Sequence, residues 1–149
     1  MADDQNTRSL PINFTQDFLP DLQLLARLLP FAAGNGVGDK QKIGEDTGIP
    51  TGKSSGKVEP MIHYASAMGL IQAQRNAGTW TLELTSLGEI VISEDPYLRE
   101  PLTLWMMHLM ICRRNGIADE AKGIADPWFA LFAEGELRLG KKFSQNDYL

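Results

Sequence analysis

The residues best suited to chemistry lie in one short segment, Gly48-Ile-Pro-Thr-Gly-Lys-Ser54. Its Gly-Lys-Ser ending matches the end of a phosphate-binding loop, in which backbone amides and a lysine hold the phosphates of ATP or GTP. That motif requires four residues between its glycines and a buried β-strand before them. This segment has three residues between its glycines and follows a helical pattern. We therefore expect no nucleotide binding at this loop.

The same segment contains polar groups that suit a DNA phosphate. They stand just before a helical pattern, so their side chains and free backbone amides are expected at a helix N-terminus. The residues are Lys53, Ser54, Ser55 and Lys57. A flexible turn between two helices, without any ligand, is the alternative interpretation of this loop.

Two helices and a hairpin are predicted around this loop. Helical spacing covers 40–47 and 57–68, and Pro50 lies in a stretch that cannot continue a helix. Short β-prone runs at 70–73 and 79–84 are joined by the polar turn 74–78. The order helix, turn, helix, hairpin is typical of proteins that place one helix in the DNA major groove.

Three further residues of this unit are candidates for contact with DNA. His63 and Tyr64 fall in the middle of the second predicted helix, where either side chain could read base edges. Arg75 lies on the predicted wing and could reach the backbone or the adjacent minor groove. Val58, Ile62 and Ala65 are expected on the buried side of the same helix.

Composition and charge limit the class of protein. The chain has 149 residues, 43% hydrophobic and 22% charged, which is ordinary for a globular protein. Its net charge of −5 argues against non-specific nucleic-acid binding by the chain as a whole. Residues 39–75 hold five basic and four acidic side chains, and this is the net-positive stretch of the sequence. The start of the chain lacks the features of a signal peptide, so we expect a cytoplasmic protein without a membrane segment.

No enzymatic site can be recognised. One cysteine, Cys112, and two distant histidines cannot form a disulfide framework or a metal cluster. His108 is flanked by Met107 and Leu109 and is expected to be a core histidine. No Ser-His-Asp, Cys-His or paired-carboxylate arrangement is visible, so we predict a protein without catalytic residues, metal or cofactor.

The predicted fold class is mainly α with a small β-wing. It consists of a flexible N-terminus (1–13), a winged-helix domain (14–95) and a helical extension packed on it (96–149). A first helix is expected within 14–31, beginning near Pro20, and its apolar face is expected to include Leu19, Leu22, Leu25, Ala26 and Leu29. A glycine-rich loop follows at 33–38. After the hairpin we expect a short helix capped by Ser86, a central buried helix at 102–112 and a helix at 126–133. Ser144-Gln-Asn-Asp147 looks like the cap of a helix that the sequence does not continue, which suggests a portion of something longer.

Three blocks of the sequence resemble a bacterial domain-of-unknown-function family, numbered 4007. They are TGIPTGKSSGKVEPMIHYASAMGLI (47–71), LTSLGEIVISEDPYLREPLTLWMMHLMI (84–111) and DPWFALFAEGELRLGKKFSQNDYL (126–149). The family's Asp-Pro-Tyr-Leu motif is matched at 95–98, while its N-terminal Gly-His-Glu-Thr-Phe element is replaced by Asn13-Phe-Thr-Gln-Asp-Phe18. The resemblance implies a winged-helix fold and genes that neighbour DNA phosphorothioation and sulfur-transfer genes in phage-defence islands.

The sequence therefore predicts a non-enzymatic protein that contacts double-stranded DNA, as a DNA-contacting or regulatory subunit of a bacterial DNA-modification or phage-defence system. The alternative is a protein–protein adaptor that uses a winged-helix scaffold without binding DNA. A positive stripe through Lys53, Lys57 and Arg75 would favour DNA. An exposed apolar patch that includes Trp105, Trp128, Phe129 or Phe132 would favour a protein partner.

Overall fold

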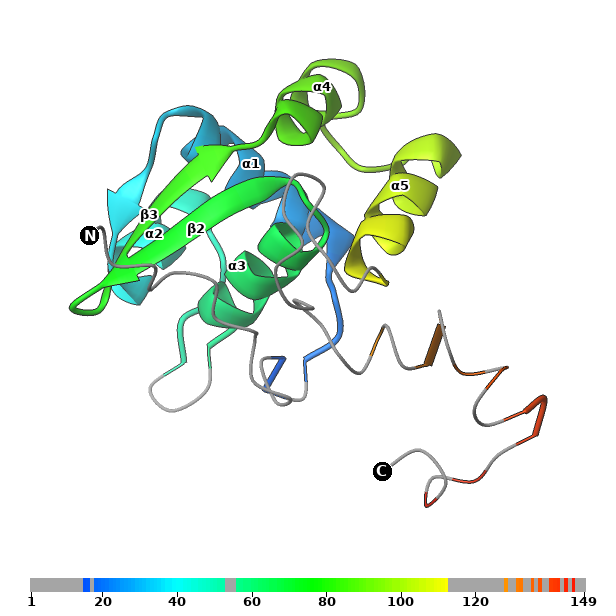
Figure 1. The fold of residues 1–149 in the computed structure, drawn as a ribbon. Helices are drawn as coiled ribbons and strands as arrows, with labels where there is room; N and C mark the ends of the chain where they lie inside the picture. Colours follow the sequence, from blue (N-terminus) through cyan, green and yellow to red (C-terminus); the bar gives the residue numbers. More distant parts are fainter. Residues whose placement is uncertain are drawn as a thin grey trace, which may run out of the picture.

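The computed structural model describes residues 15–16, 18–52 and 56–112, together with 128, 131–132, 135, 137, 140–142, 144 and 146. Within 18–112 the described residues form five α-helices and a three-stranded antiparallel sheet (Figure 1). The helices are α1 (Leu22–Ala33), α2 (Lys40–Thr47), α3 (Val58–Ala67), α4 (Ser86–Glu94) and α5 (Pro101–Ile111). The strands are β1 (Val37–Gly38), β2 (Ile71–Asn76) and β3 (Thr79–Leu84), in the order β1-β3-β2. The mainly α class with a small sheet agrees with the sequence prediction.

Helix α1 begins at Leu22 because Asp21 caps it: the Asp21 carboxylate accepts the N–H groups of Gln23 and Leu24. The buried face differs from the predicted one, since Leu19 and Leu22 are exposed. The side chains that this helix adds to the core are Leu24, Leu25, Leu28, Leu29 and Ala32. Leu25 and Leu29 are therefore buried as predicted, whereas Leu19 and Leu22 are not.

Helices α2 and α3 follow the predicted bounds within one or two residues. Asp39 caps α2 by accepting the N–H of Lys42 at 2.8 Å, and α2 ends at Gly48, which has a φ of +70°. The connection to α3 passes through Pro50, and the N–H of Lys57 donates to the Pro50 carbonyl at 3.0 Å. The turn between the two helices is thereby closed at the first turn of α3.

The predicted hairpin is present as β2 and β3. Their register runs from Ile71 opposite Leu84 to Asn76 opposite Thr79, and Ala77 and Gly78 form a two-residue turn with φ of +47° and +87°. Ala73 lies opposite Leu82 in this ladder. Strand β2 extends to Asn76 and is longer than the predicted run at 70–73, because Gln74, Arg75 and Asn76 belong to the strand and not to the turn.

Strand β1 was not predicted, since 33–38 was interpreted as a loop. Val37 pairs with Thr81 and Gly38 with Trp80, and the N–H of Leu82 donates to the Gly36 carbonyl at 2.9 Å. Gly36 is required here, because a β-carbon at this position would clash with the Phe31 side chain. The glycines thus allow the chain between α1 and α2 to lie close against the hairpin.

Helices α4 and α5 follow the sheet. The cap of α4 is Thr85, whose hydroxyl accepts the N–H of Gly88 at 3.0 Å, so the predicted cap, Ser86, is instead the first helical residue. After α4 the buried carboxylate of Asp95 accepts the N–H groups of Arg99 and Glu100, both at 2.9 Å. These two hydrogen bonds fix the turn from which α5 begins.

Helix α5 is not the central buried helix that was expected. It lies at the edge of the described structure (Figure 1), and Met107 and Ile111 are its buried residues. Almost every residue of this helix is apolar, so the sequence pattern could not indicate which face is buried. None of the described helices is long and apolar enough to cross a membrane.

Candidate nucleic-acid interface

The candidate interface surrounds the first turn of α3. A β-carbon on Gly56 would lie 2.8 Å from the backbone nitrogen of Gly52, so these two residues lie against each other just before the helix. Lys53, Ser54 and Ser55, which the sequence predicts as phosphate contacts, lie outside the described residues. The predicted helix at 126–133 also lies largely outside them; of it, Trp128, Leu131 and Phe132 are described.

Arg75 reaches from the hairpin to α3. Its guanidinium lies 2.9 Å from the Glu59 carboxylate and 5.2 Å from the ring centre of Trp80. The side chain is half exposed, while that of Glu59 is about one-fifth exposed. Arg75 therefore links the β2–β3 hairpin to α3.

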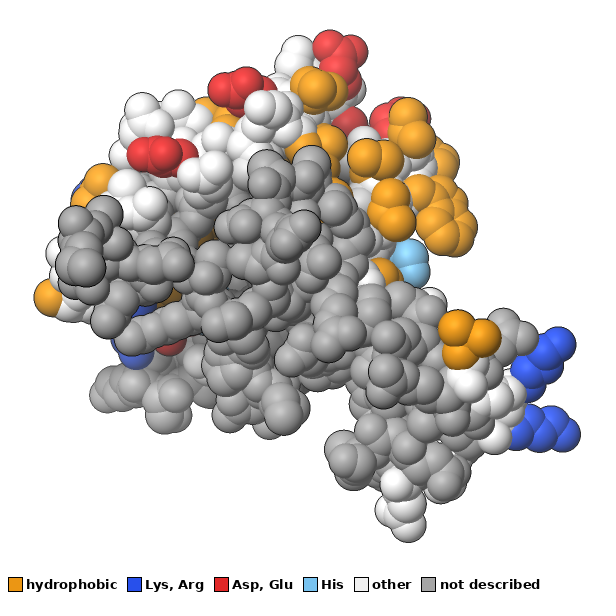
Figure 2. All heavy atoms as spheres, viewed as in Figure 1, with side chains coloured by type: hydrophobic (Ala, Val, Ile, Leu, Met, Phe, Trp, Pro, Cys, Tyr) orange, Lys and Arg blue, Asp and Glu red, His pale blue; other side chains and the backbone are white. Residues whose placement is uncertain are grey.

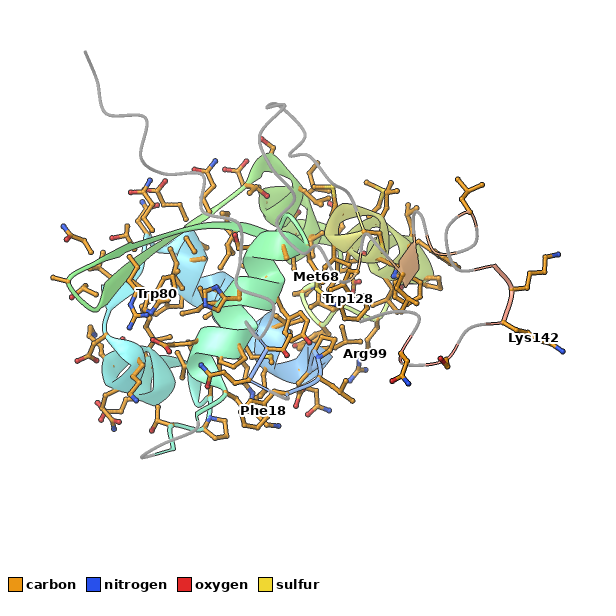
Figure 3. The ribbon with its side chains drawn as sticks, turned by 60° about the horizontal axis from the view of Figure 1, so that its bottom comes forward. Phe18, Met68, Trp80, Arg99, Trp128 and Lys142 are labelled. Carbon is orange, nitrogen blue, oxygen red and sulfur yellow. The ribbon has the colours of Figure 1, made fainter. Side chains whose placement is uncertain are left out.

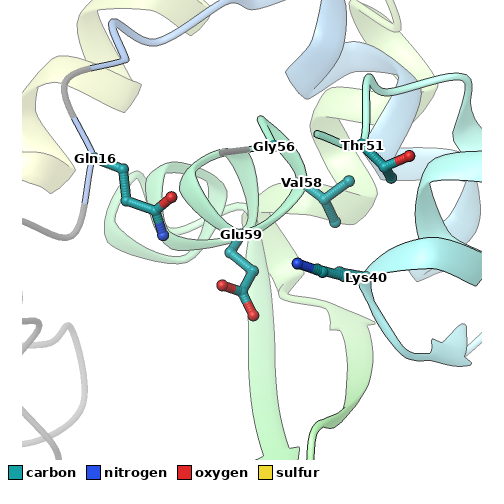
Figure 4. Close-up of a pocket in the computed structure, with 6 residues that line it drawn as sticks. All are labelled: Gln16, Lys40, Thr51, Gly56, Val58 and Glu59. Atoms are coloured by element: carbon teal, nitrogen blue, oxygen red, sulfur yellow. The ribbon is translucent and has the colours of Figure 1, made fainter. Parts of the chain in front are cut away.

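A polar pocket of about 80 Å³ opens beside Glu59. Figure 4 shows that Lys40, at the start of α2, and Glu59, in the first turn of α3, point into the same space. The remaining lining residues are Gln16, Thr51, Gly56 and Val58. In the described part of the chain Lys40 takes part in no ion pair, and its ammonium group is exposed.

Lys57 precedes α3 and faces the start of α1. Its ammonium group lies 3.5 Å from the Asp21 carboxylate and 5.9 Å from the ring centre of Phe18. Both charged side chains of this ion pair are more than one-third exposed. Together with Arg75 and Lys40, Lys57 places a third cation around the first turn of α3.

His63 lies half buried between α3 and the hairpin. Its ring and that of Trp80 form a T-shaped pair with a centroid distance of 5.4 Å. Burial lowers the pKa of His63 below its ordinary value of 6.5, Arg75 lowers it further, and Glu59 opposes this change. The imidazole is therefore neutral at pH 7 and adds no positive charge to the surface.

Tyr64 is a core residue, and its expected exposure is wrong. Only 2% of the residue is exposed, and its hydroxyl donates to the Phe18 carbonyl at 2.9 Å. Its ring also packs edge-on against Trp128, at a centroid distance of 6.5 Å. A helix that is buried on most sides leaves no room for Tyr64 to face DNA, so it is not kept among the contact residues.

The outward row of α3 consists of Glu59, His63 and Ser66, which are partly exposed and follow one another at helical spacing. Sequence reasoning missed Glu59 and Lys40. The signal for Lys40 was its position directly after the capping residue Asp39, which places its side chain in the first turn of α2.

His108 and Cys112 lie close together but lack the geometry of a catalytic pair. The sulfur is 3.8 Å from Nδ1 and 3.7 Å from Nε2, so it is nearly equidistant from the two ring nitrogens and not directed at one of them at a short distance. Burial raises the pKa of the Cys112 thiol, which favours the less nucleophilic protonated form. The described residues contain no group of three or more His, Cys, Asp or Glu that could hold a metal ion.

The chain was compared with protein families, curated proteins and solved structures, and a solved structure is similar to it. No protein-family model matches the chain, and no curated protein matches it. A solved structure described as the magnesium ion-bound SspB crystal structure is similar, with a TM-score of 0.62 and 20% sequence identity. The match covers 81% of this chain and 36% of that chain, so the sequence spans about a third of its length. At this identity the likeness shows a shared fold.

Proposed function

We propose that α2, α3 and the β2–β3 hairpin form a winged helix that binds double-stranded DNA. The observation that carries the proposal is the position of three cations near the start of α3: Lys40 lines the pocket beside Glu59, Arg75 pairs with Glu59, and Lys57 directly precedes the helix. A helix start surrounded by cations suits phosphate oxygens, and phosphate contacts set the position of a protein on the duplex.

The ion pairs of Lys57 and Arg75 are compatible with this role. Exposed ion pairs are worth only about 0–1 kcal/mol. Exchanging Asp21 for a phosphate therefore costs Lys57 little, and the phosphate brings a denser negative charge. Arg75 is half exposed, so its guanidinium has free surface for a phosphate while it stays paired with the more buried Glu59. Lys40 needs no such exchange with another residue of the described structure.

In this proposal the side chains of the outward row of α3 contact the DNA bases. His63 and Ser66 are its uncharged members, and the neutral imidazole offers one donor and one acceptor, as base-edge recognition requires. Because His63 also packs on Trp80, its ring orientation depends on the hairpin. Sequence preference would then depend on the wing as well as on α3.

We further propose that the protein is a DNA-contacting or regulatory subunit, without catalysis of its own, of a bacterial DNA-modification or phage-defence system. This context is supported by the resemblance of 47–71, 84–111 and 126–149 to domain-of-unknown-function family 4007. The similar solved structure is described as magnesium-bound. Magnesium is not part of our proposal.

The test is fluorescence anisotropy of a labelled random-sequence duplex at about 50 mM and about 200 mM salt. We expect binding at the lower salt concentration and a steep loss at the higher one, because phosphate contacts release counterions. A protein that stays unbound at about 50 mM salt would refute the proposal. That result would favour the alternative function, a protein–protein adaptor, for which the exposed apolar side chains of α5 are the candidate surface.

A further inference from the structure

Helix α5 presents an apolar row to solvent. Leu102, Trp105, Met106 and Leu109 are 75%, 70%, 36% and 55% exposed, and their spacing places them on one face of the helix. In Figure 2 hydrophobic side chains gather over this helix. Side chains of this size expose on the order of several hundred Å², and contiguous apolar surface of that extent marks interaction sites.

The row is held in place from the other side of the helix. Met107 and Ile111 are buried, and the Met110 side chain lies against Gly69 at the end of α3. The two backbone hydrogen bonds to Asp95 fix the turn before α5. The apolar face is therefore preformed on a rigid element, which reduces the entropy lost when a partner binds.

The segment that leads into the row is acidic. Residues 76–100, which lead into α5, contain five acidic side chains and one basic side chain. Glu89, Glu94 and Glu100 are exposed, and Figure 2 shows acidic side chains over α4, next to the apolar group. The one cation of this stretch, Arg99, lies over the ring of Tyr97 at 5.6 Å. An apolar row with an acidic border favours a partner whose own apolar side chains are bordered by Lys or Arg.

We propose that α5 docks an amphipathic helix of a partner protein, with apolar anchors at helical spacing and Lys or Arg beside them. Such a helix would pack along the row of α5 as two helices pack in a protein core. Its cations would face Glu89, Glu94 and Glu100, which steers association and sets orientation. A second copy of this chain packed in parallel would bring the same acidic borders together, and self-association is one of the outcomes of the test below.

A membrane surface fits less well than a protein helix. Bacterial and cytoplasmic-leaflet lipids are often anionic, and a negative surface repels an acidic border and attracts basic segments. The proposed docking does not depend on DNA binding, since Lys40, Lys57 and Arg75 belong to a different part of the molecule.

The test uses a labelled synthetic helical peptide with leucine on one face and lysine on the other, titrated with the full chain and followed by anisotropy. The key variant is Trp105→Ser/Leu109→Ser, and the matched control is Leu137→Ser, another exposed apolar residue. We expect the double variant to bind at least tenfold more weakly and the control to bind like the wild type. Equal thermal midpoints of the three proteins would show that the fold is unchanged.

The acidic border is tested separately with Glu89→Gln/Glu94→Gln/Glu100→Gln and with a peptide in which glutamate replaces lysine. Each change should weaken binding several-fold, and added salt should remove the difference. Equal binding of both peptides, or equal binding by the Trp105 and Leu109 variant, would overturn the proposal. So would concentration-dependent self-association of the wild type through these residues, or binding to anionic vesicles in place of the peptide.

Discussion

Arg75 on β2 and Glu59 on α3 form an ion pair of 2.9 Å that joins the hairpin to the helix beneath it. The pair brings the cation of the hairpin to the first turn of α3, beside the pocket that Lys40 lines. It also offers a way to alter the charge of the candidate interface without removing a cation.

Glu59→Gln should strengthen DNA binding. Removal of the carboxylate leaves Arg75 available to phosphate and raises the local potential, so affinity should rise by roughly fivefold, or about 1 kcal/mol. Anisotropy at low salt measures the change, with Glu94→Gln on α4 as the control for net charge. Weaker binding by Glu59→Gln would show that the carboxylate itself contributes to recognition, against our expectation.

Lys53→Ala/Lys57→Ala should weaken binding to all DNA sequences alike. It should also flatten the dependence of log K on log salt by up to ~1.8, because each phosphate contact in B-DNA accounts for about 0.9. The control is Lys141→Ala/Lys142→Ala, which removes the same charge; Lys142 lies far from Trp80 and the hairpin (Figure 3). If both double variants lose the same slope, the effect is one of net charge, and the site is elsewhere.

His63 should make the fold sensitive to acid. Its folded-state pKa lies below its ordinary value of 6.5, so the unfolded chain binds the proton more readily. The stability that comes from keeping His63 neutral is complete above pH 6.5 and is lost as pH falls through the lower, folded value. Urea unfolding at several pH values should show His63→Gln losing less stability than wild type on acidification. Identical pH profiles would contradict the burial of this ring.

Tyr64→Phe should affect stability and leave DNA binding unchanged. It removes the hydrogen bond to the Phe18 carbonyl, at a cost of about 0.5–1.5 kcal/mol in the free energy of unfolding.

By contrast, His63→Ala should relax any sequence preference without changing the salt dependence, since a base contact carries no counterion release. Binding selections on a random library separate the two variants. A changed preference in Tyr64→Phe would return the tyrosine to the interface.

Much of the fold could be predicted because glycine and proline mark its boundaries. Gly48, Pro50 and Gly78 end or interrupt elements whatever lies around them, so α2, α3 and the hairpin were placed correctly from local sequence. Strand β1 was missed because it has two residues and depends on pairing with β3. The face of α5 was missed because an almost wholly apolar helix has no period to interpret.

The candidate site was harder to predict, because it depends on contacts between residues that are distant in the sequence. Lys57 precedes α3 and Arg75 lies on β2, but their carboxylate partners, Asp21 and Glu59, lie on other elements. Tyr64 shows the corresponding error in burial: its neighbours on the helix allow either orientation, and contact with Phe18 decides it. Local patterns indicate where charges lie in the sequence, while tertiary packing determines which of them face a ligand.

Strand β1 has a consequence for the order in which the protein folds. The β2–β3 ladder closes across a two-residue turn, whereas the β1–β3 ladder joins residues 37 and 81. Closing the longer loop costs more chain entropy, so the hairpin can form early and β1 must pair late. The short ladder should also open first in the native state, with the amide of Leu82, which donates to Gly36, exchanging its hydrogen before the hairpin amides do. The segment between α1 and α2 is thus the last to fold and the first to open, while the hairpin above α3 stays formed.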